Sequence, residues 1–517
     1  MGDGHLLSTD LQILGSGHHL IVGSRSICEP GHIKLSACPS SAIFRFRRSP
    51  RFSSQSARPP EKYWERGSAE LHYARKMFEA GALKLEAPQD IAALVADIRR
   101  WGGEFGMIPA LNARRHPNRV AVIDDFGEMT FSELDSAANA VANGLLAKGV
   151  QGGDGVAVLA RNHRWFLVSV YGAAKVGARI ILLNSEFSGP QIKEVSEREG
   201  GKVIIYDDEY TAAVSQSQPE LGGKLRALGV NPDRAESSAA AEGDETSGST
   251  DETLEELIAR TGTQPPPKAS KHSSIIILTS GTTGTPKGAN RSAPPSLAPI
   301  GGGVLSSVPF KAKEVTSLPA PMFHALGFLH ATIAMMLGST LVLRRRFKPA
   351  TVLADIEKNK VTAIVVVPVM LSRMLDELEK TSPKPDLSSL RIVFVSGSQL
   401  GAELATRALK DLGPVIYNLY GSTEVAYATI AGPQDLSINP ATVGPVVKGM
   451  KVKILDDNGN ELPRGEVGRI FVGNFFPFEG YTGGGGKQII DGLLSSGGTW
   501  VTSTTTTYSM SAAAMTR

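Results

Sequence analysis

The sequence contains very little cysteine. Only Cys28 and Cys38 occur, and both lie near the N-terminus. The long remainder of the chain therefore has no disulfide scaffold, no cysteine-ligated metal site and no catalytic cysteine. Neither sign of charge is in large excess. The chain has 54 Lys and Arg residues and 51 Asp and Glu residues, which gives a formal net charge of +3. This balance gives no reason to expect a nucleic acid as the main partner.

Long apolar runs are absent as well. None approaches the roughly 20 residues that a membrane-spanning helix needs, so we expect no transmembrane segment, and only a peripheral contact with a membrane stays open. The composition, 41% hydrophobic and 20% charged, is typical of a soluble globular protein, which we expect in the cytoplasm. With 517 residues the chain is too long for one core, so we expect two or more lobes.

Residues 1–65 differ from the rest of the chain. They include FRFRRSPRFSSQSARPP, a stretch rich in Arg and Ser and poor in acids, as transit peptides are. A second interpretation, which we favour, is a disordered or mis-started leader with no fold of its own. A secretory signal is disfavoured because glycine and histidine interrupt LQILGSGHHLIVG and no basic run precedes it.

The central part of the chain alternates strand-like and helix-like segments. Its strand-like runs are continuously apolar and rich in Val and Ile, which is typical of parallel strands covered on both faces. We therefore expect an α/β fold, with mostly parallel sheets flanked by helices, in a large domain over residues 66–442. The expected strands are 156–160, 179–183, 202–208, 274–278, 362–367 and 391–397.

Two segments depart from this alternation. Residues 233–270 are acidic, rich in small residues and end in a proline triplet, so we interpret them as a long surface excursion or linker. From residue 443 apolar residues tend to recur at every second position, as they do in strands with one buried face. The pair Asn458-Gly459 indicates a hairpin turn. Residues 443–497 are therefore predicted to form a small β subdomain that ends the large domain.

Shorter signals predict local structure. Thr130 and Glu133 form a capping box for a helix behind the hairpin VAVIDD–GEMTF, and Asp90 is the expected N-cap of an earlier helix. We interpret the three arginines 344–346 as a solvated run at a strand end rather than a phosphate patch. The aspartates 456–457 are interpreted as turn formers rather than metal ligands.

The strongest chemical signal is SSIIILTSGTTGTPKGA, residues 273–289. A buried strand runs into a loop of glycine and hydroxyl-bearing residues, which lets backbone N–H groups and hydroxyls approach an anion. The loop is not a Walker A sequence, because its lysine follows proline and no Ser or Thr comes next. The predicted polyphosphate cradle consists of Thr279, Ser280, Gly281, Thr282, Thr283, Gly284, Thr285 and Lys287. The glycine run 483–486 lacks the strand–GxGxxG–helix setting of a dinucleotide-binding site and is interpreted as a mobile loop.

With three further segments, this loop makes the chain resemble the adenylate-forming superfamily, specifically bacterial long-chain acyl-CoA synthetases (fatty-acid–CoA ligases). The segments are PMFHALG at 321–327, VSGSQL at 395–400 and YNLYGSTE at 417–424, and they follow in the order expected for the family. The resemblance covers residues 66–497. It implies the large N-terminal adenylate-forming domain of that family.

The resemblance also implies site residues. Thr279 and Glu424 would hold Mg²⁺, which binds few carboxylates together with phosphate oxygens and water. Thr423 would contact the α-phosphate of ATP, and Tyr420 would stack on the adenine. The implied catalytic residues are His324, Thr423, Glu424 and Lys287. Besides the phosphate loop and Thr423, the implied nucleotide-binding residues are Gly397, Ser398, Gln399, Tyr420, Gly421 and Ser422.

Two of these assignments have alternatives. Taken alone, His324 is interpreted as a loop residue whose polar atoms are hydrogen-bonded and which has no role in the site. Within the segment PMFHALG, we instead place it at the carboxylate end of the acyl pocket. Ser398 and Gln399 stand where the family usually has Ala-Pro, which leaves a backbone role in nucleotide binding. His330 fits a helix packing position and receives no role.

The resemblance implies ATP-dependent fatty acyl-CoA synthesis in two steps. The fatty acid carboxylate attacks the α-phosphate, giving acyl-AMP and pyrophosphate, and the thiolate of coenzyme A then attacks acyl-AMP. ATP, a fatty acid and coenzyme A are the expected substrates. The sequence does not indicate the length of the acyl chain or the oligomeric state. Two alternatives stay open: an acyl-AMP ligase that serves a carrier protein, and a non-catalytic protein that binds nucleotide or acyl groups.

The last residues, 498–517, show no apolar periodicity and are dominated by Thr, Ser and Ala. We interpret them as a disordered tail or, preferably, as the product of a frameshift. The shifted codons permit Asp-Val-Gly-His-x-Asp and Gly-Arg-x-Asp-Asp, which resemble the ribose-binding segment and hinge of the family. We therefore expect the family's C-terminal α+β domain, with its carboxylate-directed lysine, to be absent and turnover to be impaired.

Overall fold

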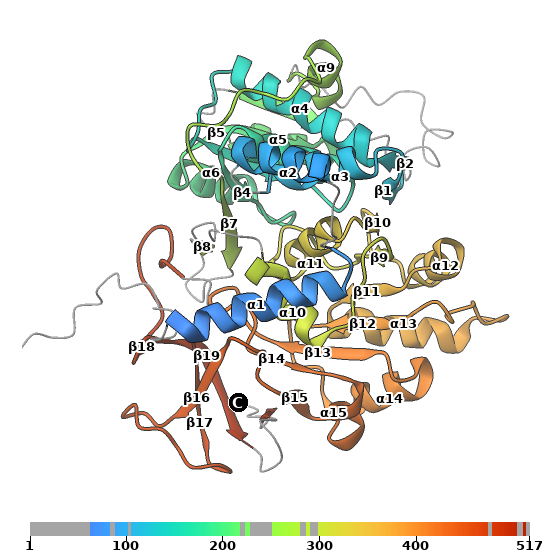
Figure 1. The fold of residues 1–517 in the computed structure, drawn as a ribbon, viewed down its shortest axis with the longest axis vertical. Helices are drawn as coiled ribbons and strands as arrows, with labels where there is room; N and C mark the ends of the chain where they lie inside the picture. Colours follow the sequence, from blue (N-terminus) through green and yellow to red (C-terminus); the bar gives the residue numbers. More distant parts are fainter. Residues whose placement is uncertain are drawn as a thin grey trace, which may run out of the picture. The chain divides into compact units, whose positions relative to one another are not determined.

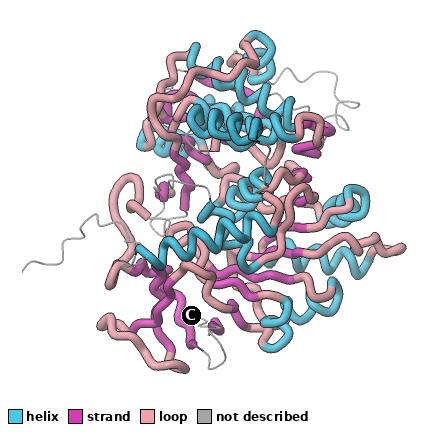
Figure 2. Tube along the Cα trace, viewed as in Figure 1, coloured by secondary structure: helices cyan, strands magenta, loops and turns pink. Residues whose placement is uncertain are grey.

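The computed structural model describes residues 63–82, 88–101, 105–217, 223–227, 251–279, 286–289, 298–473, 478–503 and 510–512. Its strands form three sheets, two of them largely parallel and flanked by helices (Figures 1 and 2). Most of residues 1–65, including the basic stretch and both cysteines, lies outside the described residues. The first helix, α1, starts at Tyr63, slightly before the expected start of the large domain. Within the described residues, no helix is both long and apolar enough to cross a membrane.

The first parallel sheet has six strands in the order β6-β5-β3-β4-β7-β8, and only the β7–β8 pair is antiparallel. Its strands are β3 (Gly155–Leu159), β4 (Arg179–Leu182), β5 (Gly201–Asp207), β6 (Gly223–Ala227), β7 (Ser274–Thr279) and β8 (Lys287–Ala289). The neighbouring helices are α2 (Pro88–Trp101), α3 (Met107–Arg115), α4 (Phe131–Ala147), α5 (Arg164–Lys175), α6 (Gly189–Arg198), α7 (Thr211–Ser217) and α9 (Leu254–Arg260), with the 3-10 turn η1 (Asp208–Tyr210).

The second sheet has eight strands in the order β14-β13-β12-β11-β9-β10-β1-β2, parallel except for the pairs at its two ends. They are β1 (Val120–Asp124), β2 (Gly127–Thr130), β9 (Val315–Ser317), β10 (Thr340–Val342), β11 (Ala363–Val366), β12 (Ile392–Val395), β13 (Ile416–Tyr420) and β14 (Thr429–Ala431). Its helices are α10 (Ala298–Ser307), α11 (Ala325–Met336), α12 (Pro349–Asn359), α13 (Pro368–Lys380), α14 (Ala402–Leu412) and α15 (Pro433–Ile438). Helix α1 (Tyr63–Glu79) packs on α10.

The third sheet is antiparallel and contains the strands after residue 441. They are β15 (Thr442–Gly444), β16 (Lys451–Leu455), β17 (Val467–Gly473), β18 (Ile489–Ile490), β19 (Leu493–Ser503) and β20 (Met510–Ala512). The Asn458-Gly459 turn reverses the chain between β16 and β17, and Asp456 accepts hydrogen bonds from the backbone N–H groups of Asn458 and Asn460. The backbone of residues 498–503 and 510–512, assigned above to a tail, lies in this sheet.

The α/β fold expected from the sequence is confirmed. All six expected parallel strands exist, and β3, β11 and β12 are buried along their whole length. Their continuous Val and Ile runs match this burial, because each strand is covered on both faces. The capping box is also confirmed, since Thr130 and Glu133 satisfy each other's backbone N–H groups at the start of α4.

Two local predictions were wrong. Asp90 is not an N-cap, because α2 already begins at Pro88, and proline suits the first turn of a helix. The segment 233–270 is not a linker throughout, since α9 occupies Leu254–Arg260. Thr253 caps that helix, and the buried side chains of Leu254 and Leu257 join the main core.

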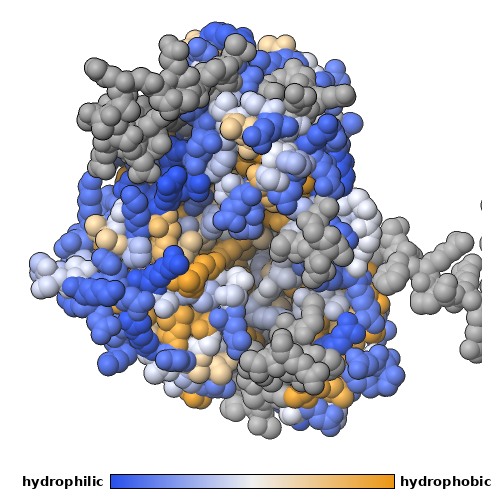
Figure 3. Space-filling model, turned by 180° about the vertical axis from the view of Figure 1, so that it is seen from behind, coloured by the Kyte–Doolittle hydropathy of each residue, from blue (hydrophilic) through white to orange (hydrophobic). Residues whose placement is uncertain are grey.

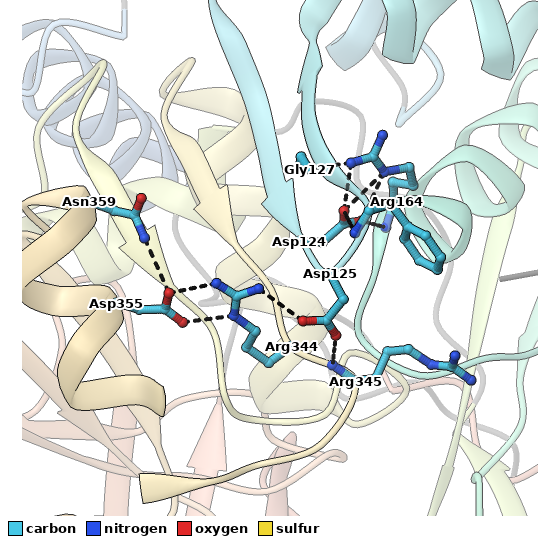
Figure 4. A network of polar contacts seen from close by, with 9 residues as sticks. Asp124, Asp125, Gly127, Arg164, Arg344, Arg345, Asp355 and Asn359 are labelled. Atoms are coloured by element: carbon cyan, nitrogen blue, oxygen red, sulfur yellow. Dashed lines mark hydrogen bonds and ion pairs between the residues drawn. The ribbon is translucent and has the colours of Figure 1, made fainter. Parts of the chain in front are cut away.

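The arginines 344–346 were also misinterpreted as a solvated run. Figure 4 shows the ion pairs of Arg344. Arg344 donates to both carboxylate oxygens of Asp355, at 2.6 and 2.8 Å, and to Asp125 at 2.9 Å. The guanidinium of Arg345 donates to Glu209 of η1 at 2.7 Å. Only the third arginine has a largely exposed side chain. The Arg345–Glu209 pair connects elements of the two parallel sheets.

A second ion pair in Figure 4 is more deeply buried. Asp124, at the end of β1, has no exposed side-chain surface and accepts hydrogen bonds from the guanidinium and backbone N–H of Arg164. The same guanidinium donates to the carbonyl of Gly127 at 2.8 Å. Asp124 thereby joins the N-terminus of α5 to the β1–β2 hairpin.

His330 is a buried residue of α11 and packs against Phe394 of β12, as its helical position suggested. Its ring centroid lies 4.1 Å from that of Phe394, and its Nδ1 lies 2.9 Å from the carbonyl oxygen of Leu326. Burial lowers the pKa of His330 to about 4, although the hydrogen bond to Leu326 opposes this shift. The folded chain therefore holds the imidazole neutral at neutral pH.

We expect His330 to make the protein less stable in acid. The unfolded chain protonates this histidine near its ordinary pKa of about 6.5, whereas the folded chain does not until about pH 4, so stability falls between these values. The loss between pH 7 and pH 5 is expected to be roughly 2 kcal/mol, and His330→Phe should remove it. Urea unfolding at both pH values measures this. The control His272→Phe, at an exposed position, should lose as much stability between pH 7 and pH 5 as the wild type. If His330→Phe also loses as much, His330 is not the source of the acid sensitivity.

Candidate functional site

A cavity of about 670 Å³ is lined by elements of both parallel sheets. Its apolar part is formed by β7 and α11 together with Phe105 and Tyr427. Its polar part lies at the carboxyl ends of β7, β12 and β13, where open α/β sheets commonly bind ligands. In the view from behind, hydrophobic surface gathers in a hollow near the middle of the molecule (Figure 3). A cavity with one polar and one apolar region suits an amphipathic substrate.

The strand before the predicted phosphate loop leads into the polar part of the cavity. Thr279, the last residue of β7, lines the cavity, and its hydroxyl donates to the carbonyl of Lys287 at 3.1 Å. Lys287 opens β8, so the loop connects two paired strands. The six loop residues between them lie outside the described residues: Ser280, Gly281, Thr282, Thr283, Gly284 and Thr285.

Glu424 is the buried carboxylate of the polar part, with 7% of its surface exposed. Ser422 donates a hydrogen bond to its Oε2 at 2.7 Å, and the Tyr481 hydroxyl donates to its Oε1. Burial alone raises the pKa of Glu424, but these two hydrogen bonds and the charge of Lys487 outweigh it and lower the pKa. The carboxylate is therefore ionised at neutral pH. Gly421, Ser422 and Thr423, which the resemblance assigned to nucleotide binding, line the cavity together with Glu424.

The segment 481–487 was not identified from the sequence as part of this site. Its glycines indicated only a loop, yet Tyr481 and Lys487 both contact Glu424, the latter with Nζ 3.9 Å from Oε1. Thr482 exchanges two hydrogen bonds with the backbone of Gly288 in β8, at 2.8 and 3.1 Å. A tyrosine two residues before a glycine run gives no signal of its own for such contacts.

The predicted adenine-binding residues are only partly brought together. Gly397 lines the cavity in a left-handed conformation at φ 97°, which glycine tolerates best. Ser398 and Gln399 follow it as exposed residues, outside the described lining of the cavity. Tyr420 ends β13, and its hydroxyl lies 2.7 Å from that of Ser496 in β19. The structure therefore fixes Tyr420 against the third sheet.

His324, the residue before α11, lies in the cavity wall. Its ring centroid is 4.4 Å from that of Phe323, and its side chain is accessible from the cavity. The surrounding protein desolvates the imidazole and lowers the pKa of His324, against the opposing charge of Glu186. A neutral imidazole at this point can donate a hydrogen bond to a substrate carboxylate.

Glu424 and Thr279 fit the requirements of a magnesium ion that arrives with a polyphosphate. Among the described residues, no group of three or more His, Cys, Asp or Glu side chains could hold a metal by itself. The carboxylate of Glu424 and the hydroxyl residue Thr279 both line the cavity, and Mg²⁺ commonly takes its other ligands from water and phosphate. The residues therefore fit metal that is bound jointly with a nucleotide.

Comparison with known sequences agrees with this geometry. The profile of the family described as AMP-binding enzyme matches residues 110–482. A feruloyl-CoA synthase from Amycolatopsis sp. is 28% identical over 389 residues, which cover 73% of this chain and 72% of the relative. A fatty acid–[acyl-carrier-protein] ligase, ScoC, from Streptomyces coeruleorubidus is 25% identical over 400 residues, which cover 75% and 73%.

A solved structure shares the fold. The inhibitor-bound N-terminal domain of FACL13 from Mycobacterium tuberculosis matches with a TM-score of 0.67 at 21% identity, covering 80% of this chain and 99% of that one. Identity this low shows the architecture alone. The architecture is that of the large adenylate-forming domain that the sequence predicted.

Proposed function

Because the chain belongs to the AMP-binding enzyme family, we propose that it activates a fatty acid with ATP and transfers the acyl group to coenzyme A. The observation that best supports this proposal is the single cavity shared by Glu424 and the apolar side chains of α11. A nucleotide phosphate at Glu424 and an alkyl chain along α11 would place the carboxylate of the acid between them, beside His324. Membership of the family supports the reaction class, and the apolar part of the cavity supports an acid with an alkyl chain as the substrate.

The proposed first step is formation of acyl-AMP. A carboxylate oxygen of the acid attacks the α-phosphorus, the new C(O)–O–P linkage forms, and the bond to the β-phosphate breaks, releasing pyrophosphate. Thr423 would donate to the α-phosphate, and Lys287 would neutralise charge on the phosphates. His324 would orient the attacking carboxylate with a hydrogen bond from its neutral ring. Such catalysis rests on positioning and preorganised charge rather than on covalent chemistry by the protein.

Mg²⁺ would be held by Glu424 and Thr279, and it neutralises charge on phosphate oxygens when bound. The backbone of Gly397 would approach the adenine from the β12 end, and Tyr420 would stack on it. In the second proposed step, the thiolate of coenzyme A attacks the acyl carbonyl and AMP leaves.

A carrier-protein thiol is the second candidate acceptor, because the relative from Streptomyces coeruleorubidus is named for that reaction. Both acceptors can be tested in one assay with ATP, Mg²⁺ and octanoate, palmitate or ferulate as the acid. Production of AMP and of palmitoyl- or octanoyl-CoA would support the proposal. Acyl transfer only to a phosphopantetheinylated carrier protein would favour the second acceptor, and turnover with ferulate alone would overturn the fatty acid assignment.

We expect Leu329→Trp to shorten the acyl region of the cavity. Leu329 lines this region from α11, so an indole there should exclude a long alkyl chain while a short one still fits. The ratio of acyl-adenylate formation with palmitate to that with octanoate should fall at least about tenfold. Pyrophosphate release with each acid measures the ratio. Leu71→Trp, at a residue of α1 that is 74% exposed, should leave the ratio unchanged. An unchanged ratio in Leu329→Trp would show that the acyl chain does not bind in this region.

A further inference from the structure

The segment 481–487 is fixed against the strand that leaves the phosphate loop. Thr482 donates its N–H to the carbonyl of Gly288, and the N–H of Gly288 donates to the Thr482 hydroxyl. A Cβ at position 288 would lie 2.5 Å from that hydroxyl, so the close approach requires glycine. The Thr482 hydroxyl also donates to Glu199, whose carboxylate is buried. These contacts hold the segment against β8.

Two lysines lie close to the Tyr481–Glu424 pair. Lys287 places its Nζ 5.8 Å from the centroid of the Tyr481 ring. Lys487 places its Nζ 3.9 Å from Oε1 of Glu424, the oxygen that accepts the Tyr481 hydroxyl. The Lys487 side chain is 28% exposed, so its ammonium group remains accessible to solvent and to a ligand.

The contact between Lys487 and Glu424 is an ion pair without a hydrogen bond, because 3.9 Å exceeds hydrogen-bonding distance. The ammonium therefore does not use its N–H donors on this carboxylate. Tyr481 and Ser422 already supply the carboxylate with donors and orient it. Lys487 is thus a cation close to the proposed metal ligand, and Glu424 does not depend on it for hydrogen bonding.

We infer that Lys487 is a second phosphate-binding lysine, which donates to the β- and γ-phosphates of ATP and thus to the pyrophosphate leaving group. This inference rests on the proposed function, because it places the triphosphate at Glu424. The carboxylate would then face the metal, and the ammonium would shift from the carboxylate to a phosphate oxygen a short distance away. Lys287 and Lys487 would then both donate to the leaving group.

Comparison of three ligands tests the assignment, since AMP lacks the phosphates that Lys487 would contact. Lys487→Gln is expected to weaken binding of ATP and of pyrophosphate at least about tenfold in the presence of Mg²⁺, as for loss of a charge-assisted hydrogen bond. AMP affinity should stay within about twofold, and Lys487→Arg should recover most of the loss. Isothermal titration calorimetry on the full chain measures all three affinities.

Lys451→Gln, at an exposed lysine on β16, serves as the matched control and should bind all three ligands like the wild type. Equal weakening of AMP and ATP by Lys487→Gln would assign Lys487 a merely structural role and overturn the inference. Unchanged ATP and pyrophosphate affinities would overturn it as well, while the proposed function stands. Failure of the wild-type chain to bind ATP would instead overturn the proposed function, and the inference with it.

Discussion

Replacing Glu424 with glutamine is expected to lower Mg²⁺-dependent formation of acyl-AMP by at least about a hundredfold. Glutamine keeps the shape of the side chain, and its amide oxygen can accept from one of the two hydroxyls, Ser422 or Tyr481. The other hydroxyl must turn to accept from the amide NH2, so the substitution removes the charge and reverses one hydrogen bond. That charge is the property a magnesium ligand needs. The lowered pKa of Glu424 means that the wild-type carboxylate carries it throughout the neutral range.

The measurement is pyrophosphate release as a function of Mg²⁺ concentration, with the unfolding midpoint recorded for each variant. Glu403→Gln, at an exposed position on α14, is the matched control and should retain wild-type rates. High Mg²⁺ should partly restore activity in Glu424→Gln, because the remaining ligands still bind the metal weakly. Wild-type activity of Glu424→Gln at ordinary Mg²⁺ concentrations would show that another group holds the metal.

Asp124→Ala is expected to destabilise the folded chain by about 3–5 kcal/mol. The substitution leaves the guanidinium of Arg164, whose side chain is only 11% exposed, without its carboxylate partner. It also removes the acceptor for the backbone N–H groups of Phe126 and Arg164. The loss therefore combines an uncompensated buried charge with unpaired backbone donors, and both are costly.

Urea unfolding followed by circular dichroism measures this loss. Glu197→Ala provides the contrast, because its ion pair with Lys193 is about half exposed and should contribute less than about 1 kcal/mol. A loss in Asp124→Ala no larger than that in Glu197→Ala would mean that Arg164 finds other partners. The carbonyl of Gly127, which already accepts from Arg164, would be the first of these.

The fold was predictable where the sequence carries a long periodic or continuous signal. The two parallel sheets follow from apolar runs such as 202–208 and 391–397, because buried strands need apolar residues on both faces. Strands β9 and β10 have three residues each and were missed, since so short a run has no recognisable period. Helix α9 was hidden inside an acidic, small-residue segment, although its capping box was present in the sequence.

Contacts between distant residues account for what the sequence could not show. The arginines 344–346 read as solvated because their partners, such as Asp125 and Glu209, lie more than a hundred residues away in the chain. In the candidate site, the motif around Glu424 was recognisable as a local pattern. The contacts of Glu424 with Tyr481 and Lys487 were not recognisable. They depend on how the loop between β17 and β18 packs on β8, and the Gly288–Thr482 contact that fixes this packing joins residues 194 positions apart.

The pairing of β1 with β10 has a consequence for synthesis of the chain on the ribosome. The Thr340 hydroxyl donates to the carbonyl of Val120, 220 residues earlier, and the six-stranded sheet is encoded between these strands. At about 5–20 residues per second, β1 waits on the order of ten to forty seconds for its neighbour, while the six-stranded sheet can already close. During that interval β1 presents an unpaired edge, where premature association between nascent chains would begin. Asp125 and Glu128 in the hairpin place like charges beside this edge, and their repulsion would oppose such pairing.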